Sequence, residues 1–235
     1  MKDIKSYFVT LVNYETELIS ERYEYLSDRN PVQVAELDLT FQKSHCDILG
    51  TLISRYMKEK CPWYSDSMYS EYFVGDFTPI EQIISDFPID YVPSLCELLH
   101  VNYLNSEIVL SNGIIKRKKS KKNLLKNGAV YTQDEISYII VKSTLSKFSD
   151  DELGNIKILD FAIGTGRFYR QILRVLTERS TMPIDDVIVN NIYGVDIDGI
   201  AVNISRLFAM SQLSDKSIAK FKKVSKNIIC KNALI

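Results

Sequence analysis

Long apolar runs are missing from this sequence of 235 residues. A helix that crosses a bilayer needs about 20 mostly apolar residues, and no run in the chain approaches that length. The N-terminal segment MKDIKSYFVTLVNYETE contains acidic residues and lacks a long apolar core, so it does not resemble a secretory signal. We therefore expect a cytoplasmic protein that makes no use of a membrane.

Clustered metal ligands are missing as well. The four cysteines show no C-x-x-C spacing, and the two histidines, His45 and His100, form no ligand pattern with them. A tetrahedral zinc site needs clustered nitrogen and sulfur ligands, so no metal site is expected. Because the chain has no secretory signal, its thiols are expected to be reduced.

The overall composition is ordinary, but the charge is unevenly divided. With 46% hydrophobic and 25% charged residues, the chain is typical of soluble globular proteins and unlike disordered or collagen-like ones. Residues 1–110 contain 8 Lys and Arg against 18 Asp and Glu, whereas residues 111–235 contain 21 against 12. This asymmetry indicates two parts with different partners, and the basic part is compatible with nucleic acid binding.

The acidic part is predicted to be helical. Apolar residues recur at every third or fourth position from Phe8 to Leu26 and again from Val34 to Tyr56, and each series forms one face of a helix. A further helix is predicted over residues 92–103. His45 lies on the apolar face of the second helix, so we interpret it as a core histidine rather than a catalytic base.

A basic stretch separates the two parts. Residues 116–122 (KRKKSKK) carry six positive charges in seven positions. Like charges at this density repel one another and disfavour a packed element, so the stretch predicts a mobile linker. The expected organisation is a helical domain over 1–110, a basic linker over 111–127 and a second domain over 128–235. The linker lysines Lys118, Lys119, Lys121 and Lys122 are either simply solvated or contact DNA phosphates in a salt-sensitive manner.

The second domain alternates between strand and helix patterns. Strands are predicted over residues 156–160, 192–196 and 221–229, with amphipathic helices after the first two. Another helix is predicted to begin at Thr132, because Thr132-Gln-Asp-Glu135 fits a capping box. Alternating strands and helices predict an α/β fold with a mostly parallel sheet covered by helices.

The first predicted strand leads into the segment Asp160-Phe-Ala-Ile-Gly-Thr-Gly-Arg-Phe168. Glycine tolerates positive φ and lets a ligand approach the backbone, and the next helix begins with free N–H groups. The segment therefore predicts a site for a nucleoside-containing cofactor. Tyr169 stands where the dinucleotide pattern G-x-G-x-x-G has its third glycine, which disfavours a pyrophosphate. At the end of the second strand, Asp196 is positioned to accept hydrogen bonds from a ribose, whereas Asp198 is better positioned to cap the next helix.

Four segments match one set of known motifs in the expected order. Asp160–Phe168 is similar to D-P-A-C-G-T-G-x-F, and Asn127–Thr132 is similar to G-x-x-Y-T-P. Ile192–Asp198 and Asn227–Leu234 match the two motifs that follow. Together they resemble the N6-adenine-specific DNA methyltransferases of restriction-modification systems, and the helical part resembles that of the larger restriction-enzyme methylases. The resemblance implies a partial Rossmann-like methyltransferase domain, S-adenosylmethionine as cofactor and double-stranded DNA as partner.

The resemblance also implies roles for individual residues. Tyr131 and Thr132 would border the methionine moiety of the cofactor. Asp196 would hold the ribose, with Ile197 beside the adenine ring and Asn232 near the adenine end. The main cofactor loop would consist of Asp160, Ala162, Gly164 and Gly166.

The sequence departs from the family in two ways. Phe161, Ile163 and Gln133 replace the usual Pro, Cys and Pro of these motifs, and Phe161 adds bulk beside the cofactor loop. The catalytic Asn/Asp-Pro-Pro-Tyr/Phe motif, which would follow Asn232 by some tens of residues, is absent from residues 1–235. In that motif the Asn and the aromatic ring hold a flipped adenine for methylation.

We therefore expect the N-terminal, cofactor-binding part of such an enzyme, truncated and inactive alone. One alternative is a non-catalytic DNA-binding or assembly subunit, or a remnant of such a system, that docks a chain or downstream segment supplying catalysis and target recognition. A methyltransferase acting on RNA, protein or a small molecule is a second alternative. A nicotinamide-dependent oxidoreductase is the third, and the missing third glycine disfavours it.

Overall fold

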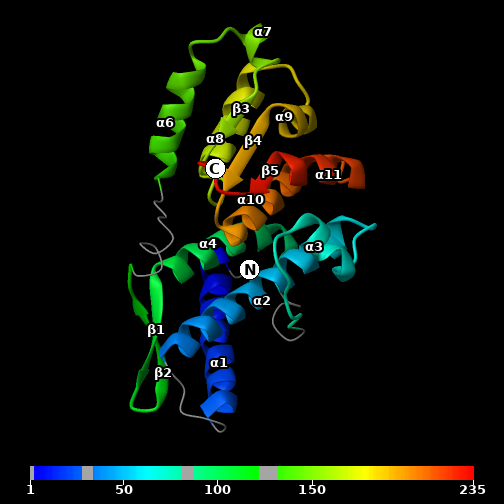
Figure 1. Ribbon diagram of the computed structural model, residues 1–235. Helices are drawn as coiled ribbons and strands as arrows, with labels where there is room; N and C mark the ends of the chain where they lie inside the picture. The colour runs from blue at the N-terminus through cyan, green and yellow to red at the C-terminus, as the bar shows by residue number, and fades with distance from the viewer. Residues whose placement is uncertain (1–2, 28–33, 81–86, 122–131) are drawn as a thin grey trace. The chain divides into compact units, whose positions relative to one another are not determined.

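The computed structural model describes residues 3–27, 34–80, 87–121 and 132–235 (Figure 1). The chain divides into two compact units. The first, which we call the helical unit, comprises Met1–Glu59 and Asp76–Ala129. The second, which we call the sheet unit, comprises Lys60–Gly75 and Val130–Ile235. The expected helical domain over 1–110 therefore differs from the structure at residues 60–75, which pack with the sheet unit.

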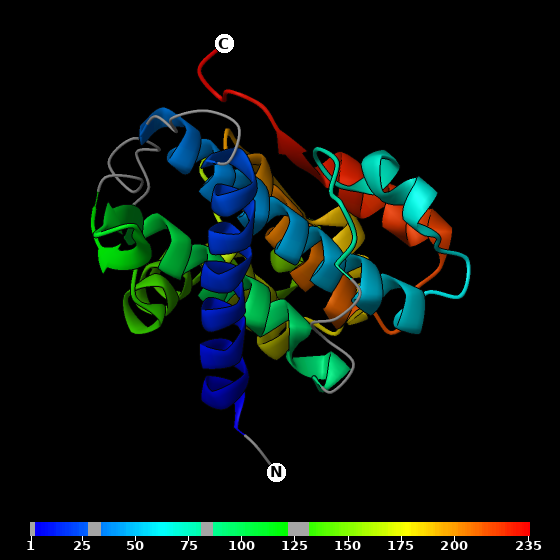
Figure 2. The ribbon, with the colours of Figure 1, turned by 90° about the horizontal axis from the view of Figure 1, so that it is seen from below.

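Three long helices form the core of the helical unit: α1 (Ile4–Ser27), α2 (Val34–Lys60) and α4 (Val92–Leu104). All three helical predictions are confirmed to within a few residues at each end. Figure 2 shows α1 lying across α2, and the fully buried side chains Leu11, Ile48 and Leu99 come one from each helix. A short turn, η2 (Ile89–Tyr91), precedes α4.

A buried polar network links these helices to a β-hairpin. His45 Nδ1 lies 2.7 Å from Glu15 Oε1, and Arg117 Nη2 donates to Glu15 Oε2 at 2.5 Å. Burial lowers the pKa of His45 despite the adjacent carboxylate. On the other side of the ring, His45 Nε2 lies 3.2 Å from His100 Nδ1. Burial opposes ionisation of Glu15, but His45 and Arg117 lower its pKa overall. The interpretation of His45 as a core histidine is confirmed.

The basic stretch is largely a strand, so the prediction of a mobile linker is wrong for residues 111–119. Strands β1 (Ser106–Ser111) and β2 (Ile114–Lys119) pair antiparallel around a turn with positive φ at Asn112 and Gly113. In β2, Ile115 is buried and the charge of Arg117 is neutralised by Glu15. The charge repulsion expected from the sequence is therefore offset by a partner from another element.

The sheet unit contains a three-stranded parallel sheet in the order β3-β4-β5. The strands are β3 (Ile158–Asp160), β4 (Ile192–Asp196) and β5 (Ile228–Cys230). The helices that follow residue 130 in this unit are α6 (Asp134–Leu145), α7 (Asp150–Leu153), α8 (Arg167–Arg179), α9 (Ile184–Asn190), α10 (Gly199–Gln212) and α11 (Ile218–Asn227). The prediction of mixed helix and parallel sheet is confirmed.

Two local predictions in this unit are wrong. Of the strand predicted over 221–229, residues 221–227 belong to α11 instead, because the buried side chains Phe221 and Val224, three positions apart, share one face of a helix. Only residues 228–229 lie in a strand, β5. The expected capping box at Thr132 is absent, since α6 begins at Asp134 and its N-cap residue Gln133 makes no side-chain cap bond. A capping box forms at the start of α7 instead.

Residues 60–75, which we call the arm, complete the sheet unit. They include the short helices η1 (Asp66–Met68) and α3 (Tyr69–Tyr72). Among the helices that the structure describes, none combines the length and apolar character needed to span a membrane.

Candidate functional site

The glycine-rich turn connects β3 to α8. It leaves the strand after Asp160 and enters the helix at Arg167, with φ of +54° at Gly164 and +87° at Gly166. These left-handed conformations favour glycine. A Cβ atom at Gly164 would meet nothing within 4 Å, so the backbone there faces open space. The turn therefore leaves room for a ligand next to the start of α8, and we call residues 160–166 the loop.

Asp196 at the end of β4 holds this loop in place. Its Oδ2 atom accepts a hydrogen bond from the Gly164 N–H at 2.7 Å, and its Oδ1 atom accepts one from the Asp198 N–H at 2.9 Å. The Ile163 N–H donates to the Val195 carbonyl at 3.1 Å. The sequence predicted a ribose contact for Asp196, with a helix cap as the alternative. The structure adds a tether between the loop and the second strand.

Asp198 acts as the helix cap expected of it. Its Oδ1 atom accepts hydrogen bonds from the N–H groups of Ile200 and Ala201 at 2.9 and 3.2 Å, at the start of α10. The division of roles predicted from the sequence is therefore observed for the cap, since Asp198 caps the helix while Asp196 binds the loop.

The two carboxylate oxygens of Asp160 differ in their hydrogen bonding. Oδ1 accepts from the Ala162 N–H at 3.1 Å, whereas Oδ2 is buried and has no hydrogen-bond partner among the described residues. Burial raises the pKa of Asp160, and the negative charge of Asp196 raises it further. A buried acceptor without a donor is unfavourable, so this position suits a ligand that brings a hydrogen-bond donor or a positive charge.

Two residues outside the predicted set also shape the loop. Ser205 on α10 is fully buried, and its hydroxyl donates to the Gly164 carbonyl at 2.7 Å. A Cβ atom at Gly194 on β4 would lie 2.2 Å from Ile163 Cδ1, so the strand needs glycine where the loop packs on it. A glycine inside a strand is a sequence signal for such a close approach. No comparable signal identifies Ser205.

The other predicted residues lie in different settings. Ile197 directly follows Asp196 and is 67% exposed. The Thr132 carbonyl accepts from Arg167 Nη1 at 3.0 Å, which joins the start of α6 to the start of α8. Asn232 is exposed, and its Oδ1 atom accepts from the N–H of Leu234. Tyr131 lies outside the described residues.

The predicted phosphate-contacting lysines belong to the helical unit. Lys118 and Lys119 are exposed on β2, and Lys121 is exposed just beyond it. Lys122 lies outside the described residues. Lys118 faces Glu107 in the hairpin register, so one negative charge neighbours this basic surface.

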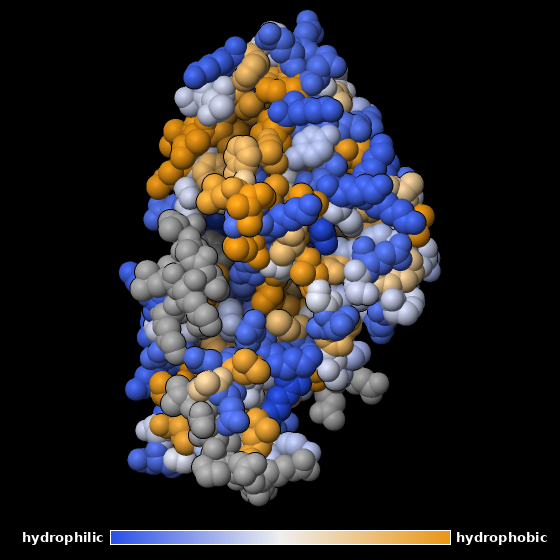
Figure 3. All heavy atoms as spheres, viewed as in Figure 1, coloured by the Kyte–Doolittle hydropathy of each residue, from blue (hydrophilic) through white to orange (hydrophobic). Residues whose placement is uncertain are grey.

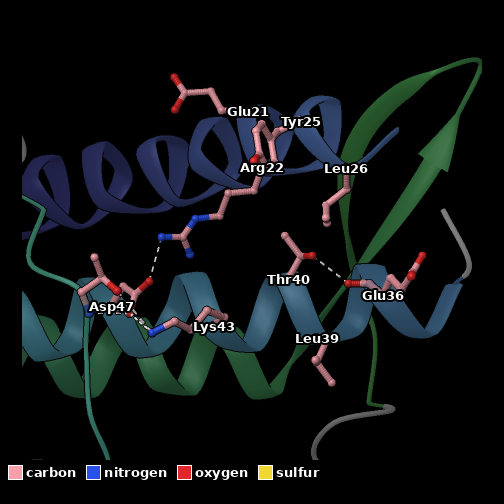
Figure 4. Close-up of a pocket in the computed structure, with 10 residues that line it drawn as sticks. Glu21, Arg22, Tyr25, Leu26, Glu36, Leu39, Thr40, Lys43 and Asp47 are labelled. Carbon is pink, nitrogen blue, oxygen red and sulfur yellow. Dashed lines mark hydrogen bonds and ion pairs between the residues drawn. The ribbon is translucent and has the colours of Figure 1, made fainter. Parts of the chain in front are cut away.

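Two further surface features lie outside the predicted site. Apolar atoms gather over α6 in Figure 3, where Ile136, Ile139 and Ile140 are exposed. A hollow of about 630 Å³ lies between α1 and α2 of the helical unit (Figure 4). Within it, Asp47 accepts from Arg22 and from Lys43, each at 2.7 Å. These polar groups are therefore engaged with one another.

Comparison with known proteins finds a partial likeness to one curated protein. No family model matches the sequence, and no solved structure matches it significantly. A protein of Methanocaldococcus jannaschii, provisionally named a type II restriction enzyme and methyltransferase, is 28% identical over 183 residues. The alignment covers 52% of this chain, and the chain spans only 15% of that relative's length.

Proposed function

We propose that the sheet unit binds S-adenosylmethionine as the cofactor-binding part of a DNA adenine N6-methyltransferase of a restriction-modification system. The observation that carries the proposal is the loop, which is tied to β4 by Asp196 and leaves the Gly164 backbone open. The four motifs in family order and the partial likeness to a named restriction enzyme and methyltransferase support it. A Rossmann-like methyltransferase domain is part of this proposal.

The residues present fit this cofactor, which supplies a methyl group on a positively charged sulfonium. The free oxygen of Asp160 would accept a hydrogen bond from the ligand and favour its positive charge. Each carboxylate oxygen of Asp196 can accept more than one hydrogen bond, so contacts to the ribose and to the loop are compatible. The exposed face of Ile197 would contact the adenine ring. Residues 1–235 contain no Asn-Pro-Pro-Tyr motif, so no residue is assigned to hold the target base.

Calorimetric titration with S-adenosylmethionine tests the proposal. The chain should bind the ligand, S-adenosylhomocysteine should compete, and Asp196→Ala should weaken binding at least tenfold. Asp151→Ala is the matched control, because Asp151 is an exposed aspartate on α7, away from the loop, and its variant should bind like the unmodified chain. Absence of binding at millimolar ligand, or preferential binding of a nicotinamide dinucleotide, would contradict the proposal.

DNA contact is a separate part of the proposal and rests on the basic face of β2. Lys118, Lys119 and Lys121 are exposed, whereas Arg117 is committed to Glu15. Duplex binding, followed by fluorescence anisotropy, should weaken steeply with salt. Replacing the three lysines with alanine should lower the slope of log affinity against log salt by about 0.9 for each phosphate that the variant no longer neutralises. A salt-independent signal would exclude phosphate contact as its source.

A further inference from the structure

The arm, although it precedes the loop by about a hundred residues, packs firmly on the sheet unit. Trp63, Tyr72 and Phe73 surround Phe221 of α11, with ring centroids 5.0, 4.9 and 6.0 Å away. The indole N–H of Trp63 donates to the Lys216 carbonyl at 2.7 Å. The arm is therefore anchored to this unit by an aromatic cluster and a long-range hydrogen bond.

Two buried polar side chains of α10 fix the end of the arm. Asn203 Oδ1 accepts from the Val74 N–H at 2.6 Å, and Asn203 Nδ2 donates to the Val74 carbonyl at 3.0 Å. Arg206 donates to the carbonyls of Tyr72 at 2.8 Å, Ile228 at 2.8 Å and Ser225 at 3.0 Å. The Val74 peptide is thus held in a single position, and the same arginine joins the arm to β5.

This anchoring brings Val74 to the start of α10. A Cβ atom at Gly199 would lie 2.7 Å from Val74 Cγ1 and 3.7 Å from Cys230 Sγ. Cys230 Sγ lies 3.6 Å from the Ile197 carbonyl, and Gly199 follows Asp196 by three residues. Val74 therefore lies at the carboxyl ends of β4 and β5, the edge of a parallel sheet where ligands bind.

We infer that Val74 forms a wall of the pocket for the adenine base of the cofactor, next to Ile197. This inference rests on the proposed function. Val74 is 38% exposed, so part of its side chain is available to a ligand, while Asn203 engages its peptide on both sides. The contact is therefore apolar, and a planar purine suits an apolar wall. Val74 is a binding residue that positions the base, and the arm is part of the cofactor site.

Substitutions at Val74 in the full chain test the inference by calorimetry with S-adenosylmethionine. Val74→Ala should weaken binding about threefold, since it removes two methyl groups from a partly exposed contact. Val74→Trp should weaken binding at least tenfold by filling the space next to Ile197. Val9→Trp is the matched control, because Val9 is an exposed valine, 53% accessible, in the helical unit. This variant should bind like the unmodified chain.

A photolabel provides a readout that a purely structural role would not affect. S-adenosylmethionine carrying an azido group on its adenine should crosslink to residues 73–75, located by peptide mass spectrometry. If Val74→Trp proves unstable on thermal unfolding, the photolabel and Val74→Ala decide the question. The inference is overturned if the label is found only in other segments. It is also overturned if both Val74 variants bind S-adenosylmethionine as tightly as the unmodified chain. Either result leaves the proposed function intact. Failure of the unmodified chain to bind overturns both.

Discussion

Replacing Asp196 with alanine removes the acceptor for two backbone N–H groups at once. These groups, on Gly164 and Asp198, donate to separate carboxylate oxygens at 2.7 and 2.9 Å. Hydrogen bonds to a charged group contribute about 1.5–3 kcal/mol each. Asp196 is partly exposed, and water can satisfy some of the lost bonds, so we expect the free energy of unfolding to fall by about 2–4 kcal/mol.

Asp196→Asn refines this prediction. The amide keeps one acceptor oxygen, but its NH₂ group must then face one of the two N–H donors. We therefore expect a loss of about 1.5–3 kcal/mol even though shape and volume hardly change. Urea unfolding without ligand, followed by circular dichroism, measures both variants. If Asp196→Ala unfolds at the same urea concentration as the unmodified chain, Asp196 does not tether the loop.

Ser205→Ala separates the tether from ligand contact. Ser205 holds the same loop through the Gly164 carbonyl, and its loss should cost about 1 kcal/mol of unfolding free energy. Because the proposed ribose contact belongs to Asp196, calorimetry should find S-adenosylmethionine affinity nearly unchanged in Ser205→Ala and strongly reduced in Asp196→Ala. Equal affinities in the two variants would refute a direct role for Asp196 in binding.

Three further substitutions probe the structure elsewhere. Gly194→Ala places a Cβ atom 2.2 Å from Ile163 Cδ1, so the free energy of unfolding should fall by about 1–3 kcal/mol in thermal unfolding. Adding Ile163→Val, which removes Cδ1, should restore part of this loss. Burial raises the pKa of Asp185, but hydrogen bonds from a lysine ammonium and two backbone N–H groups outweigh burial and lower the pKa to about 2. The ionised carboxylate therefore adds about 2 kcal/mol to the free energy of unfolding above pH 4, and this contribution is lost as the pH falls toward 2. In urea unfolding, the Asp185→Asn variant should lack this part of the pH dependence. Glu15→Gln leaves the charge of Arg117 without its carboxylate, so the free energy of unfolding in urea should fall by about 3–5 kcal/mol. The double variant with Arg117→Met should regain part of this stability.

Local patterns in the sequence were sufficient for features that depend on neighbouring residues. β4 was predicted with its observed bounds, 192–196, because a short apolar run ends there in a polar turn. The helical face from Val34 to Tyr56 and the cap at Asp198 likewise depend on contacts within a few residues. The same holds for the glycine turn, since positive φ at Gly164 and Gly166 is a property of the backbone itself.

Residues 221–227 were predicted wrongly as a strand because their pattern is compatible with two structures. Phe221 and Val224 are apolar residues within a short run, which can belong to a strand or to one face of a helix. In the structure the ring of Phe221 packs against Trp63 and Tyr72 of the arm. Those partners lie about 150 positions earlier, and no local pattern of this segment contains them.

The sequence by itself determined the alternation of strands and helices, the glycine turn and the acidic residues at the strand ends, because each depends on local backbone preferences and periodicity. Only the tertiary structure decided that Arg117 is neutralised by Glu15, 102 positions away, and that residues 116–119 of the basic stretch lie in a strand. It also decided that Asp196 tethers the loop and that the arm brings Val74 to the strand ends. These features depend on contacts between distant segments, which form only when the chain is folded.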